Sequence, residues 1–509
     1  MFDLLSLPIY VDEATYLSWA LDIWDQRTRA ALMIPIVVDG KQPLFMWLAG
    51  GASYLFPDPL LAGRVVSALA GVLSAVGIYL VGRWLMGRRV GLLAGLLYAV
   101  VPFNLFYDRL ALVEGLLNAE AVWALALAVF IMGKERDARC AVLGGAGLGL
   151  ALGAALWTKM PALFILPFPL LCALLLSKRG RVMVPARGFA VAGAIVAVAA
   201  TLLFLAPHAG SLWDKAQGFT EPPQVFLTYL PGRLESNLLR YWSWLYAYLP
   251  TPLWGLALVA AVWGLARRTR LALLLLGCWA AFTMPTMLWS RGEMFQSRYV
   301  SQGIFPLLLL VAALMVASWD ALWSRRRSRW QRLAALRPVG QLAASTLFLV
   351  LIGPTLWFDV QLLNRPESAP LPPTDRFLFV TSFDSGYGFK EAVQLVRQRA
   401  IELTRNGQPV IVLGNYYFGH TYDGLKIYLR GVPGVFQYVD SHMARDPEGF
   451  IAAWKSHRVP ILLVGNDGLD RLDAFEKAVP RAKRLGFFPK PTGQSSFRVY
   501  EVDVADLGP

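Results

Sequence analysis

The stretch GRVVSALAGVLSAVGIYLVG (Gly63–Gly82) is apolar along almost its whole length, and it is long enough to cross a bilayer as one helix. The basic residues Arg83, Arg88 and Arg89 follow it. Similar apolar stretches recur along the chain, near 63–82, 90–106, 116–133, 140–157, 160–176, 188–206, 252–266, 271–289, 300–319 and 340–358. We therefore predict an all-α polytopic membrane domain of about ten spans.

The composition also indicates a membrane protein. Of the 509 residues, 56% are hydrophobic and only 16% are charged, and the mean hydropathy is +0.48. A soluble globular protein of this length does not need so much apolar surface. The net charge of +14 would suggest nucleic-acid binding in a soluble chain, but the basic residues lie in short loops such as Arg267–Arg270 and Ser324–Arg332. This pattern is typical of membrane topology and of contact with anionic lipid, so we expect no nucleic-acid partner.

The cysteines and histidines point to neither a disulfide framework nor a zinc site. Cys140, Cys172 and Cys278 all lie in apolar segments, and they lack the spacing of metal ligands. The four histidines are scattered along the chain, so a site built from histidines is not expected.

Positive charge is concentrated in every second connection between the apolar stretches. These connections are Arg83–Arg89, Lys134–Arg139, Ser177–Arg181, Arg267–Arg270 and Arg325–Arg337. Because basic loops of membrane proteins face the cytoplasm, one orientation satisfies all five. It places outside the loop of Asp12, the loop Arg109–Glu114, the segments 207–250 and 290–300, and everything after about residue 360.

The N-terminus needs a further assumption in this orientation. MFDLLSLPIY (Met1–Tyr10) is too short to span a membrane, and it is not a signal peptide with a basic start and a cleavage site. Either the first spans insert as a hairpin, or the chain begins late and lacks an initial helix. We favour the second explanation.

A polar region follows the proline-rich stretch Asn364–Arg376. Four of its runs have strand character: FLFVTSF (Phe377–Phe383), PVIVLG (Pro409–Gly414), PILLVGN (Pro460–Asn466) and FRVYEVD (Phe497–Asp503). They alternate with amphipathic stretches over Lys390–Gly407 and Leu469–Gly486. We therefore predict a transmembrane domain over residues 1–360 and a small extracytoplasmic α/β domain over residues 361–509.

A short set of ionisable residues falls on the predicted outer side, in loops that are distant in sequence. The set is Asp12, Glu13, Lys41, Arg109, Glu114, Lys159, Glu293 and Arg298. Ionisable residues near a membrane are costly and tend to be functional. Carboxylates can take a proton from an acceptor hydroxyl, and cations can hold a phosphate. The competing interpretation is that these residues are solvated or snorkelling charges, with Asp12 and Glu13 complementing a helix dipole.

Five motifs in this order carry a resemblance to a known family. They are VDEATY (Val11–Tyr16), GKQPLFMWL (Gly40–Leu48), YDRLALVEGLL (Tyr107–Leu117), TKMPALFILP (Thr158–Pro167) and SRYVSQGIFPLLLL (Ser297–Leu310). Over roughly residues 8–320 the chain resembles the bacterial relatives of protein O-mannosyltransferases and of the lipid A aminoarabinose transferase. The resemblance implies a GT-C fold and a membrane glycosyltransferase, hexosyl- or pentosyl-transferring, that uses a polyprenyl-phosphate-linked sugar and acts on the cell envelope.

The resemblance implies roles for three acidic residues. Asp12 matches the residue of the first outer loop that acts as, or next to, the catalytic base, and Glu13 is its neighbour in that motif. Glu114 matches a second acidic residue. A divalent metal, Mg²⁺ or Mn²⁺, held by these three carboxylates is a further option, because hard oxygen ligands suit such ions.

The resemblance also implies a set of substrate-binding residues. Lys41 matches a lysine that faces the lipid phosphate, within Lys-Gln-Pro where the family has a Lys-Pro-Pro-like element. Lys159 matches the lysine of a Lys-Gly-Pro-like element, with Met160 in place of glycine. Arg298 and Tyr299 match an Arg-Tyr element near the phosphate, and Arg109 completes the substrate-binding set.

These roles predict an inverting transfer from a polyprenyl-phosphate sugar to an extracytoplasmic protein, lipid or glycan acceptor. Asp12 accepts the hydroxyl proton, and Lys41, Lys159 and Arg298 stabilise the phosphate leaving group. One alternative is a transporter or flippase of lipid-linked sugars, which would carry inverted repeats and midplane charges. Another is a membrane protein without catalytic activity that presents its outer domain to partners.

Overall fold

The computed structural model describes residues 3–133, 137–177, 183–221, 224, 226–324, 337–405, 407–440, 446–454, 459–467, 472–493 and 495–503. The chain forms two compact units. The first, called here the domain unit, comprises Met1–Thr28, Met46–Gly63 and Pro373–Pro509. The second, called the membrane unit, comprises Arg29–Phe45 and Arg64–Pro372.

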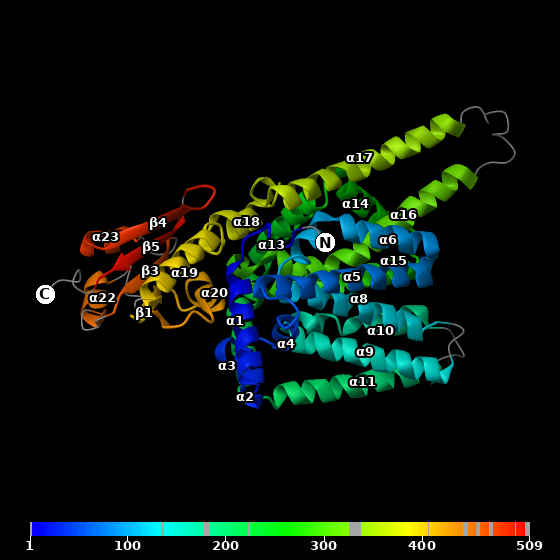
Figure 1. Ribbon diagram of the computed structural model, residues 1–509. Coiled ribbons are helices and arrows are strands. Elements are labelled where there is room, and N and C mark those ends of the chain that lie inside the picture. Colours follow the sequence, from blue (N-terminus) through cyan, green and yellow to red (C-terminus); the bar gives the residue numbers. More distant parts are fainter. Residues whose placement is uncertain are drawn as a thin grey trace. The chain divides into compact units, whose positions relative to one another are not determined.

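The membrane unit is a bundle of helices (Figure 1). Its long helices are most of α5 (Pro59–Met86), α6 (Arg88–Val100), α8 (Val113–Ile131), α9 (Ala138–Thr158), α10 (Pro167–Leu176), α11 (Met183–Phe204), α13 (Phe226–Tyr248), α14 (Thr251–Ala266), α15 (Arg270–Trp289), α16 (Ile304–Ser324) and α17 (Arg337–Asn364). Shorter elements connect them: α2 (Arg29–Leu32), α3 (Ile34–Asp39), α7 (Pro102–Tyr107), η1 (Met160–Phe164), α12 (Gly210–Phe219), η2 (Gly292–Met294) and η3 (Ser297–Gly303).

Each apolar stretch predicted as a span overlaps a helix of this bundle. Within the described residues, six helical segments are long and apolar enough to cross a membrane: Pro59–Met86, Val113–Ile131, Ala138–Thr158, Met183–Phe204, Arg270–Trp289 and Ser297–Ala321. Two apolar segments, Met160–Leu176 and Pro252–Ala266, are shorter. The chain is therefore a multi-pass membrane protein, and the count of ten spans stays a prediction.

Glycines let α9 and α11 pack closely, as is common between helices in membranes. A Cβ atom on Gly145 would lie 2.1 Å from the carbonyl oxygen of Gly188, and one on Gly149 would lie 2.9 Å from that of Ala192. These contacts fix α9, which ends at Thr158, directly before Lys159.

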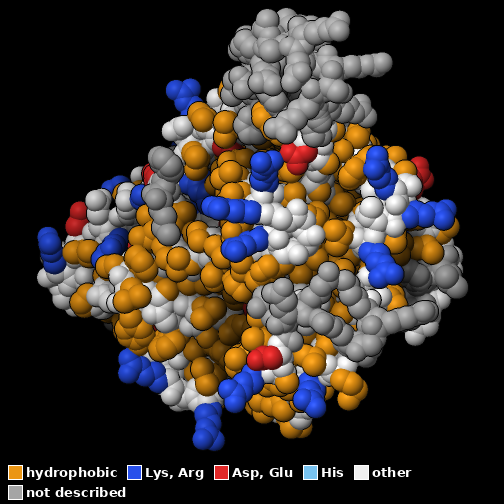
Figure 2. Space-filling view, turned by 90° about the vertical axis from the view of Figure 1, so that its right-hand side faces the viewer, with side chains coloured by type: hydrophobic (Ala, Val, Ile, Leu, Met, Phe, Trp, Pro, Cys, Tyr) orange, Lys and Arg blue, Asp and Glu red, His pale blue; other side chains and the backbone are white. Residues whose placement is uncertain are grey.

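Positive charge gathers at one end of the bundle. The C-terminal ends of α5, α8 and α16 and the N-terminal ends of α6, α9 and α11 lie together at this end (Figure 1). Exposed arginines sit at these helix ends, among them Arg83, Arg88, Arg89 and Arg139. Figure 2 shows the face, with Lys and Arg side chains spread among hydrophobic ones and few acidic side chains between them. The described arginines of two predicted basic connections, Arg83–Arg89 and Lys134–Arg139, thus lie at one end of the bundle, and the alternation of all five connections stays a prediction.

The domain unit combines N-terminal helices with the C-terminal α/β region. Its helices are α1 (Val11–Gln26), most of α4 (Leu44–Ala52), α18 (Pro373–Arg376), α19 (Phe389–Arg405), α20 (Leu425–Leu429), α22 (Pro447–Trp454) and α23 (Asp473–Ala478). Two π-helical turns cover Phe377–Thr381 and His420–Gly424. The strands are β1 (Val410–Gly414), β2 (Val435–Val439), β3 (Ile461–Asp467), β4 (Lys483–Pro489) and β5 (Ser496–Val502).

The described strands form one mixed sheet in the order β2-β1-β3-β5-β4. β1 is parallel to β2 and β3, whereas β5 is antiparallel to β3 and β4. Alternate residues of β1 point to opposite faces. Ile411 and Leu413 join a core with Phe450 of α22 and Phe475 of α23, while the amphipathic helix α19 packs against the sheet through its own buried face. Helices therefore cover the sheet on both sides (Figure 1).

The predicted α/β domain is confirmed, but two of its predicted elements are wrong. Phe377–Phe383 is not a strand: Pro373 begins a short helix, and a π-turn continues it over Phe377–Thr381. Among its described residues, 472–486, the second predicted amphipathic stretch is helical only at α23, and its end enters the edge strand β4.

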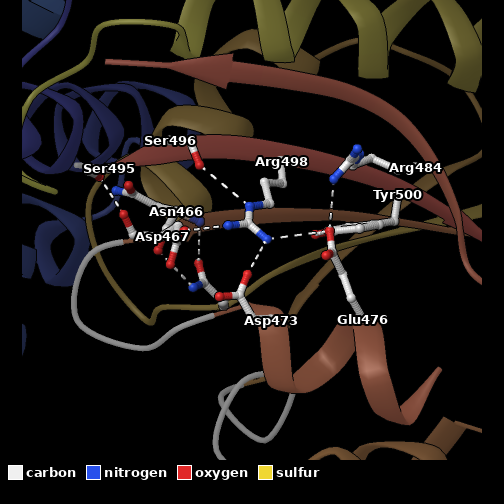
Figure 3. Close-up of polar contacts among 10 residues, drawn as sticks. Asn466, Asp467, Asp473, Glu476, Arg484, Ser495, Ser496, Arg498 and Tyr500 are labelled. Atoms are coloured by element: carbon white, nitrogen blue, oxygen red, sulfur yellow. Dashed lines mark hydrogen bonds and ion pairs between the residues drawn. The ribbon is translucent and has the colours of Figure 1, made fainter. Parts of the chain in front are cut away.

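Arg498 of β5 ties the short helix α23 to the sheet (Figure 3). Its guanidinium donates to Asp467 Oδ2 at 2.7 Å and to Asp473 Oδ1 at 2.8 Å. Tyr500 donates to Glu476 Oε1 at 2.7 Å, and Glu476 also accepts from Arg484 at 3.2 Å. In this set, called here the Arg498 network, the charged side chains at one end of the sheet pair with one another.

Candidate functional site

The turn between α7 and α8 carries the motif YDRLALVEG and is anchored on both sides. Tyr98 donates to Asp108 Oδ2 at 2.7 Å, and burial raises the pKa of Asp108 to about 7. The Tyr107 and Ser297 hydroxyl oxygens share a hydrogen bond of 2.6 Å. These bonds hold the start of α8 beside the start of η3, where the motif SRYVSQG begins.

Glu114, in the first turn of α8, is the centre of the site. Its side chain is only 2% exposed, and its Oε1 accepts from Lys159 Nζ at 2.6 Å. Arg298 Nε lies 3.8 Å from the same oxygen. Gln302 donates to the backbone oxygen of Glu114 at 3.1 Å, which fixes η3 against α8. A carboxylate buried to this degree requires compensating positive charge, and the two cations supply it.

The two cations share a second neighbour, the ring of Tyr299. Lys159 Nζ lies 4.2 Å from the ring centroid, and Arg298 Cζ lies 5.2 Å from it. Both distances are within the range of cation–π attraction. Lys159 stands directly after α9 in an extended conformation, and Pro161, two residues later, has no backbone N–H with which to continue the helix. Three segments predicted from sequence to share a site therefore meet at Glu114.

Lys41 belongs to a neighbouring ionic group. Asp39 accepts from Lys215 Nζ at 2.5 Å and pairs with Lys41 Nζ at 3.0 Å. Gly40 adopts a φ of +58°, and a Cβ atom there would lie 2.1 Å from the backbone oxygen of Ser211. Only glycine permits both this backbone conformation and this approach of α12 to the end of α3.

Aromatic rings connect the two ionic groups. Lys215 Nζ lies 5.5 Å from the ring centroid of Phe219, and that ring meets Tyr299 edge-on at 6.3 Å. The set Lys41, Lys159, Lys215 and Arg298, with Asp39, Glu114, Phe219 and Tyr299, is called here the cationic cluster. Its partly exposed lysines can bind an anion. The buried carboxylate of Glu114 keeps Lys159 in place.

The sequence-predicted residues divide between the two units. Lys41, Glu114, Lys159, Arg298 and Tyr299 fall in the cationic cluster. Arg109 lies half-buried in the turn between α7 and α8, and Glu293 lies in η2. Asp12 and Glu13 belong to the domain unit.

The acidic pair begins α1. Glu13 is fully buried, and its Oε2 accepts from the backbone nitrogen of Tyr10 at 2.8 Å, so its carboxylate caps the helix. Asp12 is half-buried in the same turn, where negative charge also suits the helix dipole. The catalytic roles of both residues stay predictions.

Sequence reasoning missed Asp39, Asp108, Lys215, Phe219 and Gln302. Asp39 stands two residues before Lys41, and Asp108 stands directly before Arg109, so a search for charged neighbours of the motifs would have found both. Lys215 lies in the predicted outer segment 207–250, but only tertiary structure brings it to Asp39.

A divalent metal at Glu114 does not fit this donor set. Among the described residues, no three His, Cys, Asp or Glu side chains are grouped to hold a metal ion. Glu114 already faces Lys159 and Arg298, whose positive charges oppose a cation beside the same carboxylate.

Comparison with known proteins supports the fold. The family model described as dolichyl-phosphate-mannose-protein mannosyltransferase matches residues 40–207, which is less than half of the chain. A search of curated proteins found no match.

Solved structures resemble the whole chain. ArnT from Cupriavidus metallidurans in the apo state has a TM-score of 0.61 and 16% identity, covering 100% of this chain and 96% of its own. The same protein bound to undecaprenyl phosphate has a TM-score of 0.60 and 17% identity, with coverage of 100% and 97%. The archaeal oligosaccharyltransferase AglB from Archaeoglobus fulgidus, in complex with an inhibitory peptide and a dolichol-phosphate, has a TM-score of 0.54 and 14% identity, with coverage of 96% and 70%. The predicted GT-C fold is thereby confirmed.

We predict that Glu114 and Lys159 are energetically coupled. Lys159→Met leaves a buried carboxylate with only Arg298 nearby and lowers thermal stability, whereas adding Glu114→Gln recovers part of the loss. The expected coupling is about 0.5–3 kcal/mol. Thermal unfolding of both single variants and the double variant in detergent measures it.

The matched control is the ion pair between Arg89 and Asp320, whose side chains are 74% and 54% exposed. The same cycle on this pair should give a coupling near zero, because exposed pairs contribute little. Additive effects at Glu114 and Lys159 would show that the buried pair does not hold the site.

Proposed function

We propose that this protein is a membrane glycosyltransferase that moves a sugar, with inversion, from a polyprenyl-phosphate-linked donor to an extracytoplasmic acceptor. The observation that carries the proposal is the cationic cluster, which gathers Lys159, Arg298 and Tyr299 around Glu114 in a GT-C fold. Two proteins of similar fold bind undecaprenyl phosphate and dolichol-phosphate, and the matching family model is named for a dolichyl-phosphate donor.

The chemistry of the donor explains the residue types. When the acceptor oxygen bonds to the anomeric carbon, the bond from that carbon to the phosphate oxygen breaks, and the phosphate leaves with the electron pair. A phosphate is already a stable anion, so it needs positive charge rather than a general acid. Lys41, Lys159 and Arg298 supply this charge, with Lys215 as a further cation of the same cluster.

The acceptor hydroxyl needs a base, and Asp12 takes that role in the proposal. A carboxylate within hydrogen-bond reach of the hydroxyl accepts its proton as the new bond forms. Glu13 is committed to capping α1, so its contribution is to hold the turn that carries Asp12. Direct attack from the face opposite the phosphate inverts the anomeric carbon.

The direct test is incubation of the purified chain with a panel of radiolabelled polyprenyl-phosphate sugars and candidate protein, lipid and glycan acceptors. Transfer of label from one donor identifies both sugar and acceptor. Translocation of a lipid-linked sugar across vesicles without transfer would favour the flippase alternative, to which the comparisons give no support.

Asp12→Asn should abolish transfer while donor binding is retained. The amide keeps the size of the side chain but cannot accept a proton at neutral pH, and loss of a general base costs about 10²–10⁴-fold in rate. Turnover and lipid-donor binding are measured side by side. Asp25→Asn, the same change in the last part of α1, is the control and should leave turnover unchanged. Near-normal turnover of Asp12→Asn would remove Asp12 from the mechanism.

Arg298→Lys should impair transfer even though it conserves charge. Arginine can grip a phosphate with two parallel hydrogen bonds, which lysine cannot reproduce. Arg298→Ala should be more severe, with defects in both donor affinity and rate. Arg267→Lys, at an exposed position after α14, serves as the control. An Arg298→Lys protein indistinguishable from the parent would exclude the two-bond grip.

The proposal also places the loops of Asp12, Arg109 and Arg298, and the region after about residue 365, outside the cytoplasm. In a background without Cys140, Cys172 and Cys278, a membrane-impermeant thiol reagent should label an exposed Phe436→Cys in intact cells. Arg268→Cys, in a basic connection, should react only after permeabilisation. Labelling of both positions from the same side would contradict this orientation.

A further inference from the structure

We infer that the C-terminal α/β region holds the first turn of α1 in place, an arrangement called here the clamp. In this arrangement His420, Asp384 and Asp423 are positioning residues for Asp12. The inference rests on the proposed function, because it concerns the base of that reaction. All of these residues belong to the domain unit.

Two backbone contacts hold the chain directly before Asp12. His420 Nε2 lies 2.8 Å from the carbonyl oxygen of Ile9, and the backbone nitrogen of Val11 donates to the carbonyl oxygen of Asp384 at 3.1 Å. The ring of Tyr10 also packs on that of Phe379, with centroids 4.4 Å apart. Three successive residues are therefore fixed by the C-terminal region.

A further contact holds the helix one turn later. Asp423 Oδ2 accepts from Thr15 Oγ1 and from the backbone nitrogen of Gly419, each at 2.8 Å. Asp423 and Thr15 are both buried. These contacts stand on either side of Asp12 along the chain, so they fix both the entry to α1 and the rotation of its first turn.

Glycines make this close approach possible. A Cβ atom on Gly419, whose φ is +73°, would lie 2.2 Å from Val11 Cγ2. A Cβ atom on Gly386 would lie 2.0 Å from the carbonyl oxygen of Ile9. Side chains at these two positions would push the acidic turn away from the domain. The surface is thus shaped to receive residues 9–11.

The clamp is supported from inside the domain. Lys490, 2% exposed, donates to the carbonyl oxygens of Ser382 and Phe383 at 2.9 and 3.1 Å, which fixes the loop that carries Asp384. It donates also to Asn466 Oδ1 of β3 at 3.1 Å, so the loop is tied to the sheet. A firmly held loop at Asp384 suits the role of positioning Asp12, because the rate of a reaction depends on the position of its base.

His420 donates its hydrogen bond to Ile9 as a neutral imidazole. Its ring lies between those of Phe389 and Phe497, with centroid distances of 5.2 and 5.5 Å. Burial and the nearby charge of Lys490 lower the pKa of His420 to about 3. At neutral pH one ring nitrogen carries a proton; because the carbonyl of Ile9 can only accept a hydrogen bond, that nitrogen is Nε2, which donates to it.

The test compares His420→Leu, His420→Gln and Thr15→Val in the full chain. Leucine removes the donor to Ile9, whereas the glutamine amide restores an N–H at a similar reach. Thr15→Val removes the bond to Asp423 without changing size, and it provides a second probe should leucine at 420 impair folding. Two readouts are taken: hydrogen exchange of the peptide covering residues 9–16, and the separate kcat and donor affinity of transfer.

We expect His420→Leu and Thr15→Val to speed exchange in residues 9–16 and to lower kcat by up to about 10²-fold with donor affinity unchanged. His420→Gln should restore both. The control is Tyr500→Phe, which removes a bond of the Arg498 network in the same domain (Figure 3) and should change neither readout.

Other outcomes separate the possible failures. Unchanged exchange in residues 9–16 in both His420→Leu and Thr15→Val would overturn the clamp. Faster exchange with an unchanged kcat would overturn the positioning role while the proposed function stands. A parent chain that transfers no sugar would overturn the proposed function and with it the role of His420, while the exchange data would still report whether the clamp exists.

Discussion

A buried negative charge at Glu114 is the constraint on which the membrane unit depends. The carboxylate sits in the first turn of α8, and the low dielectric of its surroundings makes it costly unless cations stand beside it. Lys159 and Arg298 come from two other segments to meet this need. The same arrangement concentrates positive charge beside the ring of Tyr299, which is the property that a lipid phosphate requires.

In the proposed reaction, the cations and the base belong to different units. The membrane unit provides the cations that stabilise a leaving phosphate, and its order comes from helix packing and from the bonds between α8 and η3. The domain unit carries Asp12 on a turn that is held from Ile9 to Thr15 by the C-terminal region. Charge stabilisation and proton transfer therefore rest on different structural supports, so each can be perturbed separately.

Much of this architecture is readable from the sequence because it depends on local properties. Each apolar stretch predicted as a span overlaps a helix of the bundle. Short motifs predicted that Glu114, Lys159 and Arg298 share one site, and the three side chains do meet. The rest depends on contacts between distant residues. The bond of His420 to Ile9 joins positions 411 residues apart, and Lys215 reaches Asp39 only because Gly40 lets α12 approach. The run Phe377–Phe383 has the composition of a strand, but a helical start at Pro373 carries it into a π-turn.

The central claim is that the cationic cluster recognises the phosphate of a polyprenyl lipid. Native mass spectrometry of the purified chain can compare undecaprenyl phosphate with undecaprenol, the alcohol that has the same tail and no charge. Because the tails are identical, any difference in occupancy reports the contribution of the phosphate. The account predicts that the phosphate lipid binds and survives gentle activation, whereas the alcohol does not. Equal occupancy by the two lipids, or no binding of the phosphate lipid, would contradict it.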